Sequence, residues 1–383
     1  NFIQLFCCFE IGTIVHFNFW AYCLIVATTM LALRSVANLK KVKNINITST
    51  TGRYVKNTNP MYFSTNTAMH PSFALTDETY VKEYGVTSLR YTHKQTGADI
   101  LSIIAPEDSN KVFSINFRTP ASDSTGIAHV MEHSVLCGSK KFPVKEPFVD
   151  LMKGSLQTFL NAFTYPDRTC YPVASMNTKD FYNLIDVYMD GVLHPRAVTD
   201  PFVLKQEGWH YEVDQVTDPL VYKGVVYNEM KGVYSSPESL LYKQIQQGLF
   251  PNNSYRHDAG GDPLNIPDLT MKQFQDFHND FYHPSNSKIF FYGDDEPEKR
   301  LEIIDGYLKG FNKSESSVSN SRVQLQSKFT KPKYITSNYP IAADGEEKHM
   351  LAVSWLLNEE KSVDLSPKEQ LALGVLNHLL LGR

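Results

Sequence analysis

The chain has 383 residues, 42% of them hydrophobic, which is enough for two or three domains with ordinary cores. A formal net charge of −4 argues against a nucleic-acid partner, because it implies no basic face. Three of the five cysteines lie in the first 23 residues, so the rest of the chain has no disulfide framework.

The N-terminal part has the composition of a targeting leader. Residues 1–33 are strongly apolar, which suits a signal peptide, an anchor or a marginal membrane span. Residues 11–76 contain no acidic residue, and Lys and Arg stand there among many Asn, Ser and Thr, as in an organellar transit peptide. We expect residues 1–76 to be disordered or removed, to make the only membrane contact, and to direct the protein to a mitochondrion or plastid. The alternatives are a secretory route to a vacuole and upstream sequence that is not part of the protein.

The folded body is expected to begin near residue 77, where acidic residues return. Alternating apolar residues predict strands over residues 86–91, 98–104 and 112–118, the first two joined by a turn at 95–97. The third strand leads the chain directly into its most informative motif.

Residues 126–133 contain the pattern His-x-x-Glu-His, formed by His129, Glu132 and His133. On a helix the two histidines are one turn apart, so both imidazoles leave the same face. Two ring nitrogens at this spacing can bind one tetrahedral Zn²⁺, and Glu132 can take the proton of a water whose pKa zinc lowers to about 7. We expect polar caps before the helix and a glycine after it: Ser122, Asp123, Ser124 and Gly138. The alternative is a pair of ordinary histidines on a helix.

A catalytic zinc usually takes three protein ligands, so a third ligand is expected downstream. The candidates are Glu229, which follows an apolar approach at a helix start, Glu207 and, more weakly, Glu212. Chemistry alone does not separate them, since any carboxylate on a facing helix would serve. Cys137 lies four residues after His133 and could share the zinc face, but a buried thiol outside the site is favoured.

The remainder of the body alternates strands and helices. Residues 156–164 and 169–174 are predicted to pair around a turn at 165–167, and residues 288–292 to form the closing strand. Apolar spacing and capping residues predict a helix after Asp200 and helices over residues 146–153, 178–193, 237–249, 270–282 and 297–308. His278 and His283 have no partner at metal-ligand spacing and are predicted to be structural.

The domain organisation follows from a Ser-rich, polar segment at residues 313–330, which is predicted to be a linker. It separates a domain over residues 77–312 from residues 331–383. A strand at 350–357 and a helix at 367–380 make the latter look like the start of a second domain. Strands and helices interleave without regular βαβ spacing, which indicates an α+β fold with helices packed on a mainly antiparallel sheet.

Six short segments occur in an order that resembles one peptidase family. They are His-Val-Met-Glu-His at 129–133, Asn-Ala-Phe-Thr at 161–164, Gln-Glu-Gly-Trp at 206–209, Asn-Glu-Met-Lys-Gly at 228–232, Gly-Gly-Asp-Pro at 260–263 and Tyr-His-Pro-Ser-Asn at 282–286. Together they are similar to the pitrilysin-type metallopeptidases, and within these to the presequence protease and falcilysin branch. The resembling proteins are much longer, with four related domains in two halves that close over a chamber. By this resemblance the chain looks like an N-terminal fragment.

The resemblance implies a pitrilysin-like metallopeptidase domain, followed by the start of a similar second domain. It implies one Zn²⁺ held by His129, His133 and Glu229, with Glu132 as the catalytic base. A shorter interval, as in insulin-degrading enzyme, would point nearer Glu207.

The resemblance also makes the strand at 156–164 an open edge to which a substrate peptide adds as a further strand. Asn161 and Ala162 would bind the backbone of that peptide. Main-chain hydrogen bonding of this kind depends little on the sequence of the peptide.

The predicted function is a zinc-dependent endopeptidase, an oligopeptidase for short unstructured peptides such as cleaved targeting sequences or protein fragments. The second half of the resembling enzymes supplies transition-state donors, so we expect weak or no turnover by this chain alone. The alternatives are a presequence-processing peptidase that makes a single cut, a non-catalytic partner subunit that binds peptides, and a membrane-tethered structural protein.

Overall fold

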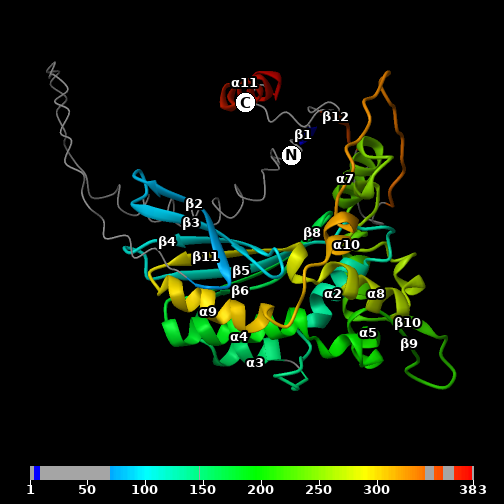
Figure 1. Cartoon of the computed structure of the whole chain (residues 1–383). Coiled ribbons are helices and arrows are strands. Elements are labelled where there is room, and N and C mark those ends of the chain that lie inside the picture. Colours follow the sequence, from blue (N-terminus) through cyan, green and yellow to red (C-terminus); the bar gives the residue numbers. More distant parts are fainter. Residues whose placement is uncertain (1–3, 9–69, 146, 341–348, 357–365, 382–383) are drawn as a thin grey trace, which may run out of the picture.

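The computed structural model describes residues 4–8, 70–145, 147–340, 349–356 and 366–381 (Figure 1). Its centre is a sheet with the strand order β2-β3-β4-β11-β5-β8-β6, and β7 also pairs with β8. The strands of this sheet are β2 (Phe73–Val81), β3 (Val86–His93), β4 (Asp99–Ile104), β5 (Lys111–Arg118), β6 (Gln157–Leu160), β7 (Phe163–Tyr165), β8 (Arg168–Ser175) and β11 (Ser287–Gly293). Only β4 and β11 pair in parallel, which confirms the predicted α+β fold with a mainly antiparallel sheet.

The sheet differs from the sequence prediction in three places. Its first strand, β2, begins at Phe73, before the predicted start of the body at residue 77. The strand predicted over residues 156–164 is divided into β6 and β7, because the chain leaves the regular ladder at Asn161 and Ala162. The strand predicted to close the domain, β11, lies in the middle of the sheet between β4 and β5.

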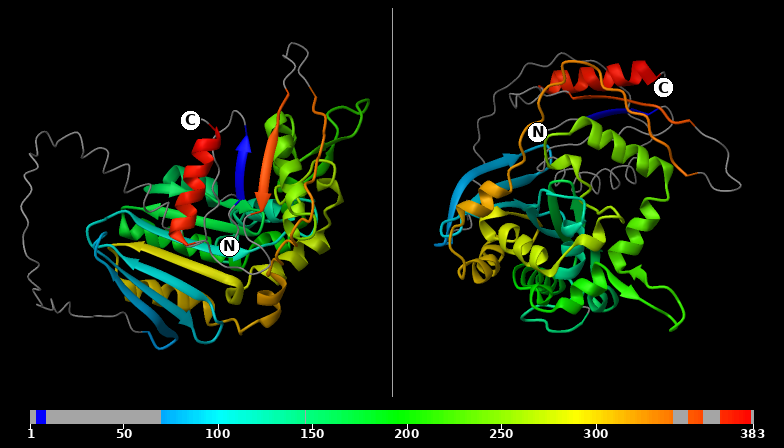
Figure 2. Two further views of the ribbon diagram at one scale, coloured as in Figure 1. Left: turned by 90° about the horizontal axis from the view of Figure 1, so that it is seen from above. Right: turned by 90° about the vertical axis from the view of Figure 1, so that its right-hand side faces the viewer.

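One face of the sheet is covered by the helices α3 (Pro147–Gly154), α4 (Thr178–Leu193) and α9 (Pro297–Leu308), as Figures 1 and 2 show. The bounds of α4 and α9 match the prediction, and the Asn177 side chain caps α4 by accepting from the backbone N–H of Asp180. The apolar face of α4 is fully buried, as predicted, through Phe181, Leu184, Ile185, Tyr188 and Val192.

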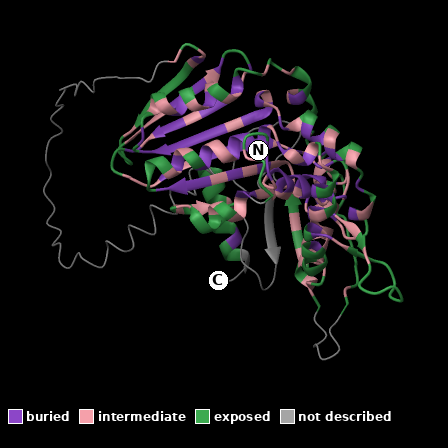
Figure 3. Cartoon of the chain, turned by 90° about the horizontal axis from the view of Figure 1, so that it is seen from below, coloured by how far each residue is buried: buried purple, intermediate pink, exposed green. Residues whose placement is uncertain are grey.

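Alternation along the central strands divides the buried residues between the two faces. Along β11, Ile289 and Phe291 join the main core under the helices, whereas Phe290 and Tyr292 join a smaller apolar cluster with Ile103. Figure 3 shows that burial is concentrated in the central strands.

The elements beside the sheet in Figure 1 carry the residues of the candidate site. They are α2 (Ile127–Val135), α5 (Pro201–Glu207), the hairpin β9 (His210–Glu212) and β10 (Val221–Lys223), α6 (Val225–Val233), α7 (Pro237–Leu249) and α8 (Met271–Phe281). The predicted caps of α2 are wrong. Gly126 stands at the N-cap in a left-handed conformation, with no side-chain hydrogen bond, and the helix ends at Val135, ahead of Gly138. The reason is a close backbone contact at Gly126, described below.

The polar segment at 313–330, predicted to be a linker, contains the helix α10 (Glu315–Asn320), which Ser314 caps. The strand β12 (Ala352–Leu356) and the helix α11 (Pro367–Leu381) confirm the two elements predicted near the C-terminus. β12 pairs with β1 (Gln4–Cys8), so these few residues of the predicted leader form a strand.

The predicted apolar and basic leader otherwise lies mostly outside the described residues. Among the described helices, none combines the length and apolar character that a membrane crossing requires.

Candidate metal centre

The helix α2 places His129 and His133 side by side, with ring centroids 4.9 Å apart. From the separate helix α6, Glu229 reaches both rings: its Oε2 lies 3.7 Å from Nε2 of His129 and 3.7 Å from Nε2 of His133. Donor atoms of these three residues all lie within 4.8 Å of one another. Two donors that each bind a tetrahedral ion at ~2.1 Å are separated by about 3.4 Å, so the three donors fit one Zn²⁺.

A backbone carbonyl orients the His129 ring. Nδ1 of His129 lies 3.0 Å from the carbonyl oxygen of Gly260, which assigns the ring proton to Nδ1 and leaves Nε2 as an electron-pair donor towards Glu229. The approach requires glycine: a Cβ on Gly126, which has φ 69°, would lie 2.7 Å from that same oxygen and 2.7 Å from Cα of Gly261. This contact explains why a glycine starts α2.

A buried carboxylate orients the His133 ring. Oε2 of Glu207 lies 3.4 Å from Nδ1 of His133, on the side of the ring that faces away from Glu229. The other oxygen of Glu207 accepts from the side-chain amide of Gln206 at 3.1 Å and from Sγ of Cys137 at 3.4 Å. Glu207 therefore orients one of the candidate donors and is not itself one of the three. Cys137 contacts this carboxylate and lies outside the three-residue group, as the sequence favoured, but its side chain is half-buried and not buried as predicted.

The third candidate, Glu212, lies in the β9–β10 hairpin. It contacts Nε2 of His210 at 3.3 Å and Nζ of Lys223 at 3.2 Å. Within the described residues, the group suited to a metal comprises His129, His133 and Glu229 alone. The geometry thus separates three carboxylates that chemistry alone left open.

Another pair of glycines brings the helices of Glu207 and Glu229 together. Gly208 ends α5 and Gly224 precedes α6. A Cβ on Gly224, which has φ 151°, would lie 2.1 Å from the carbonyl oxygen of Gly208. Only bare backbone allows this approach, so the glycines of the Gln-Glu-Gly-Trp segment and of the turn before α6 fix the distance between the two helices.

Glu132 points from α2 to the sheet edge and is only 8% exposed. The hydroxyl of Thr164 on β7 donates to its Oε2 at 2.5 Å. Burial raises the pKa of Glu132, against the opposing effects of the Thr164 hydrogen bond and of the two imidazoles. For His133, burial would lower the pKa, but the interactions with Glu207 and the neighbouring carboxylates outweigh it and raise the pKa. The carboxylates of Glu132, Glu207 and Glu229 thus give the centre a negative potential, which favours a cation.

Asn161 and Ala162 lie where the chain passes from β6 to β7, at the edge of the sheet. Asn161 is exposed, its Oδ1 accepts from the backbone N–H of Ala162 at 2.9 Å, and its carbonyl oxygen accepts from the hydroxyl of Tyr188 at 3.1 Å. Ala162 itself is buried. Through Thr164, two residues further on, this edge is joined directly to Glu132.

His278 and His283 are structural, as predicted. Nε2 of His278 lies 2.9 Å from the carbonyl oxygen of Val192, and burial lowers the pKa of His278 to about 4. His283 caps a short turn by accepting from the backbone N–H of Ser285.

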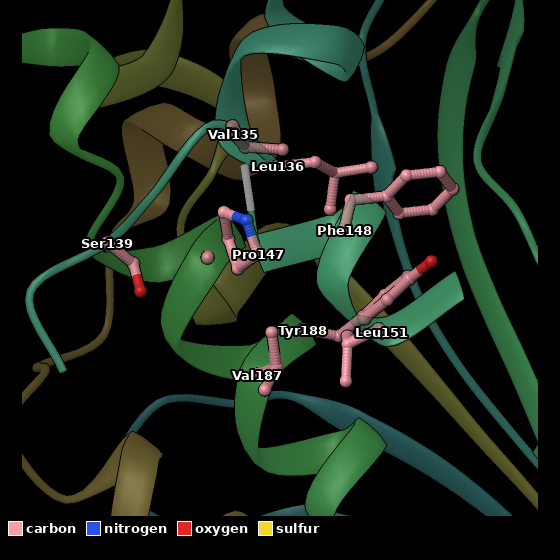
Figure 4. Close-up of a pocket in the computed structure, with 9 residues that line it drawn as sticks. Val135, Leu136, Ser139, Pro147, Phe148, Leu151, Val187 and Tyr188 are labelled. Carbon is pink, nitrogen blue, oxygen red and sulfur yellow. The ribbon is translucent and has the colours of Figure 1, made fainter. Parts of the chain in front are cut away.

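A small cavity of about 10 Å³ lies between the end of α2, α3 and α4 (Figure 4). Its lining is mainly apolar and includes Val135, Phe148, Leu151 and Tyr188. This is close to the smallest volume that holds one water, and none of the candidate metal donors lines it, so it is a packing gap rather than a substrate site.

Several contributors were not predicted from the sequence: Thr164, the Gly260 carbonyl and the orienting role of Glu207. Thr164 and Gly260 belong to segments that the family resemblance had already marked. The order of those segments was therefore a usable signal, although the contacts themselves join residues 32 and 131 positions apart.

Comparison with known proteins now defines the class. Residues 118–245 match the family described as Insulinase (Peptidase family M16), and residues 268–383 match the description Peptidase M16 inactive domain. The chain belongs to this family of pitrilysin-type peptidases, and its similarity is to the presequence protease branch. The resemblance predicted from six short segments is confirmed.

Among its relatives, Presequence protease 1, chloroplastic/mitochondrial, from Arabidopsis thaliana is 54% identical over 312 residues, which are 81% of this chain and 28% of that protein. Protein HypA from Clostridium perfringens is 50% identical, covering 73% of this chain and 29% of that protein. The mitochondrial presequence protease of Xenopus laevis is 40% identical, covering 78% and 29%. The crystal structure of pitrilysin has a TM-score of 0.48 at 16% identity and covers 64% of this chain and 25% of that chain. The chain spans less than a third of the length of these curated relatives.

Proposed function

We propose that this protein is a zinc-dependent endopeptidase that hydrolyses short unstructured peptides, such as cleaved targeting peptides or protein fragments. The observation that carries the proposal is the convergence of His129, His133 and Glu229 from two helices, with the carboxylate of Glu132 close enough to interact electrostatically with all three. Two neutral imidazoles and one carboxylate are a common ligand set of catalytic zinc, which keeps a fourth position open.

When bound, Zn²⁺ would polarise the scissile carbonyl and lower the pKa of water to about 7. His129 and His133 would hold it through Nε2 and Glu229 through a carboxylate oxygen. Glu132 would accept the proton of the attacking water and pass it to the leaving amine. Thr164 holds one oxygen of Glu132, which leaves the other oxygen to move the proton.

The substrate would add to the edge of the sheet formed by β6 and β7. An edge strand presents unpaired backbone N–H and C=O groups to any extended peptide. Asn161 is exposed on that edge and would bind the peptide backbone together with the main chain of Ala162. Thr164 connects this edge to Glu132, so a peptide held here would pass the proposed base.

The names of the relatives support a location and a substrate class. Two of them are described as presequence proteases, one chloroplastic/mitochondrial and one mitochondrial. We therefore propose that this protein acts in such an organelle on cleaved targeting peptides. Because the chain spans less than a third of those relatives, we also propose that segments outside it supply further transition-state donors. Loss of one such donor costs about 10²–10³ in rate, so the chain alone would bind zinc but turn over weakly.

Two variants of the complete protein test the proposal. Glu132→Gln should retain about one zinc per chain but lower peptide cleavage by about 10²–10⁴, the usual contribution of a general base. Glu302→Gln, an exposed carboxylate on α9, is the matched control and should leave both unchanged. Wild-type protein without bound zinc, or Glu132→Gln with unchanged cleavage, would contradict the proposal and favour a non-catalytic peptide-binding subunit.

A second candidate function is that of a processing peptidase that makes a single cut in a presequence. The name of the presequence protease relatives is compatible with this function. Digestion of a transit-peptide fusion distinguishes the two. Products from several internal cuts support the oligopeptidase, whereas a single cut at the junction supports processing.

A further inference from the structure

The segment between Asp258 and Asp262 lies against the start of α2 and contacts both helices that carry the proposed metal donors. Its Gly260 carbonyl oxygen accepts from Nδ1 of His129 at 3.0 Å. The N–H of that same peptide unit, on Gly261, donates to the carbonyl oxygen of Asp258 at 3.1 Å. The N–H of the preceding unit, on Gly260, donates to Oδ1 of Asp258 at 3.0 Å. Asp258 thus fixes the turn that presents the carbonyl to His129.

The other oxygen of Asp258 is held by α6. The hydroxyl of Tyr234, the C-cap residue that follows α6, donates to Oδ2 of Asp258 at 2.7 Å. Met230 of the same helix packs on the turn, since a Cβ on Gly260 would lie 3.1 Å from Cε of Met230. Glu229, the proposed third ligand, is the neighbour of Met230, so one helix holds both the ligand and the turn.

The charges around this contact keep it formed. Burial, and then the Asp258 carboxylate, raise the pKa of Tyr234 well above its usual value, so the phenol stays protonated and donates. Lys243 of α7 lies over the Tyr234 ring at 4.4 Å and pairs with Oδ2 of Asp262 at 2.6 Å, at the other end of the turn.

We infer that Asp258 is a positioning residue that couples the orientation of the His129 ring to the position of α6 and hence of Glu229. The inference rests on the proposed zinc site and names residues of this chain that would tune it. Groups that orient metal-bound histidines through the second ring nitrogen typically change metal affinity by about 10–100-fold when they are removed.

A second tyrosine–aspartate contact provides a matched control. The hydroxyl of Tyr307 on α9 donates to the carboxylate and the backbone carbonyl of Asp186 on α4. Burial, followed by the effect of Asp186, also raises the pKa of Tyr307 above its usual value. This contact joins two helices under the sheet and includes none of the proposed donors. A variant without the Tyr307 hydroxyl therefore shows only how the loss of a buried tyrosine hydroxyl affects the fold in general.

The test measures Zn²⁺ affinity of the 383-residue chain by competition with a chelating dye, and the visible spectrum after Co²⁺ substitution. Tyr234→Phe should weaken Zn²⁺ binding about tenfold and Asp258→Ala by up to about 100-fold, both with an altered Co²⁺ spectrum. Asp258→Asn keeps an acceptor for the Gly260 N–H and should lie between Asp258→Ala and wild type. Tyr307→Phe should match wild type in both measurements.

The inference is overturned if Tyr234→Phe, which keeps the ring and the packing, binds Zn²⁺ and Co²⁺ as wild type does. That result stands even if Asp258→Ala fails to fold. Failure of the proposed function looks different, because wild type itself would then bind no Zn²⁺ at micromolar concentrations. The inference would also be overturned if Tyr307→Phe lost as much Zn²⁺ affinity as Tyr234→Phe, since this would show a general effect on stability.

Discussion

Histidines occupy opposite environments in two regions. One lies between the helices α4 and α8, and the other is the candidate metal centre formed by α2, α5 and α6, called the metal centre below. Between α4 and α8, His278 is neutral: it stacks on Tyr282 with centroids 5.1 Å apart, and its Nε2 contacts the carbonyl oxygen of Val192. In the metal centre, Nδ1 of each histidine is engaged by Gly260 or Glu207, which leaves both Nε2 atoms directed at Glu229.

The way in which the two regions pack also differs. Apolar side chains such as Phe181, Ile185 and Phe274 fill the space around α4 and α8. In the metal centre, glycine backbones meet without side chains between them, at Gly126 with Gly260 and at Gly208 with Gly224. The difference teaches that the candidate donor histidines are recognised by an uncommitted ring nitrogen that faces other donors. They are half-buried, whereas His278 is buried, so burial does not mark them.

The sharpest contrast comes from removing one histidine of each kind. His133→Ala should lower bound zinc from about one per chain to near zero, because two donors seldom retain the ion through dialysis. His278→Gln should keep the zinc, since its ring contacts only the core. Metal analysis after dialysis measures both variants. Equal zinc in His133→Ala and wild type would remove the distinction between the two regions.

The glycine contacts predict a loss of folding stability specific to the metal centre. Gly224→Ala should lower the free energy of unfolding by roughly 2–4 kcal/mol, because a Cβ at φ 151° would lie 2.1 Å from the Gly208 oxygen. Gly232→Ala, inside α6 with open space around it, should raise the free energy of unfolding by up to about 1 kcal/mol. Urea unfolding of both variants tests this, and a stable Gly224→Ala would contradict the close contact.

The neutral histidine of the core predicts a pH dependence of stability. The pKa of His278 is lowered to about 4 in the folded protein, against about 6.5 when unfolded, so the unfolded state binds more protons between these values. The neutral His278 therefore contributes up to about 3 kcal/mol to the free energy of unfolding. This contribution is fully present above pH 6.5 and is lost as the pH falls to 4. His278→Gln should flatten the fall in the free energy of unfolding over this range. If the free energy of unfolding of His278→Gln fell with pH as steeply as that of wild type, other groups would be the cause of the fall.

The smallest expected effect concerns the carboxylate that orients His133. Glu207→Gln should weaken Zn²⁺ binding by about 10–100-fold without preventing it, because Glu207 contacts the ligand and not the donor side. Glu212→Gln, in the exposed hairpin, should leave the affinity unchanged. Dye competition measures both. Complete loss of zinc in Glu207→Gln would make Glu207 a ligand and revise the centre.

Local patterns in the sequence predicted much of the architecture. The bounds of α4, α7 and α9 match the sequence prediction, with side-chain caps at the starts of α4 and α7, and the spacing of His129 and His133 placed both rings on one helical face. Each of these features depends on residues a few positions apart, whose relation a helix determines by its own geometry. The pattern His-x-x-Glu-His is therefore readable without a structure.

The tertiary structure decided where β11 enters the sheet and what orients each imidazole, and it brings to the rings the carboxylate of Glu229, which the family resemblance had implied as the third ligand. Glu207 ends α5 and Glu229 lies in the middle of α6, and their residue type alone does not distinguish a supporting group from a candidate ligand. The distinction arises because Gly208 and Gly224 bring two backbones into contact, and Asp258 ties α6 to the turn at Gly260. Such contacts join residues far apart in the chain, so the spacing of residue types along the sequence contains no record of them.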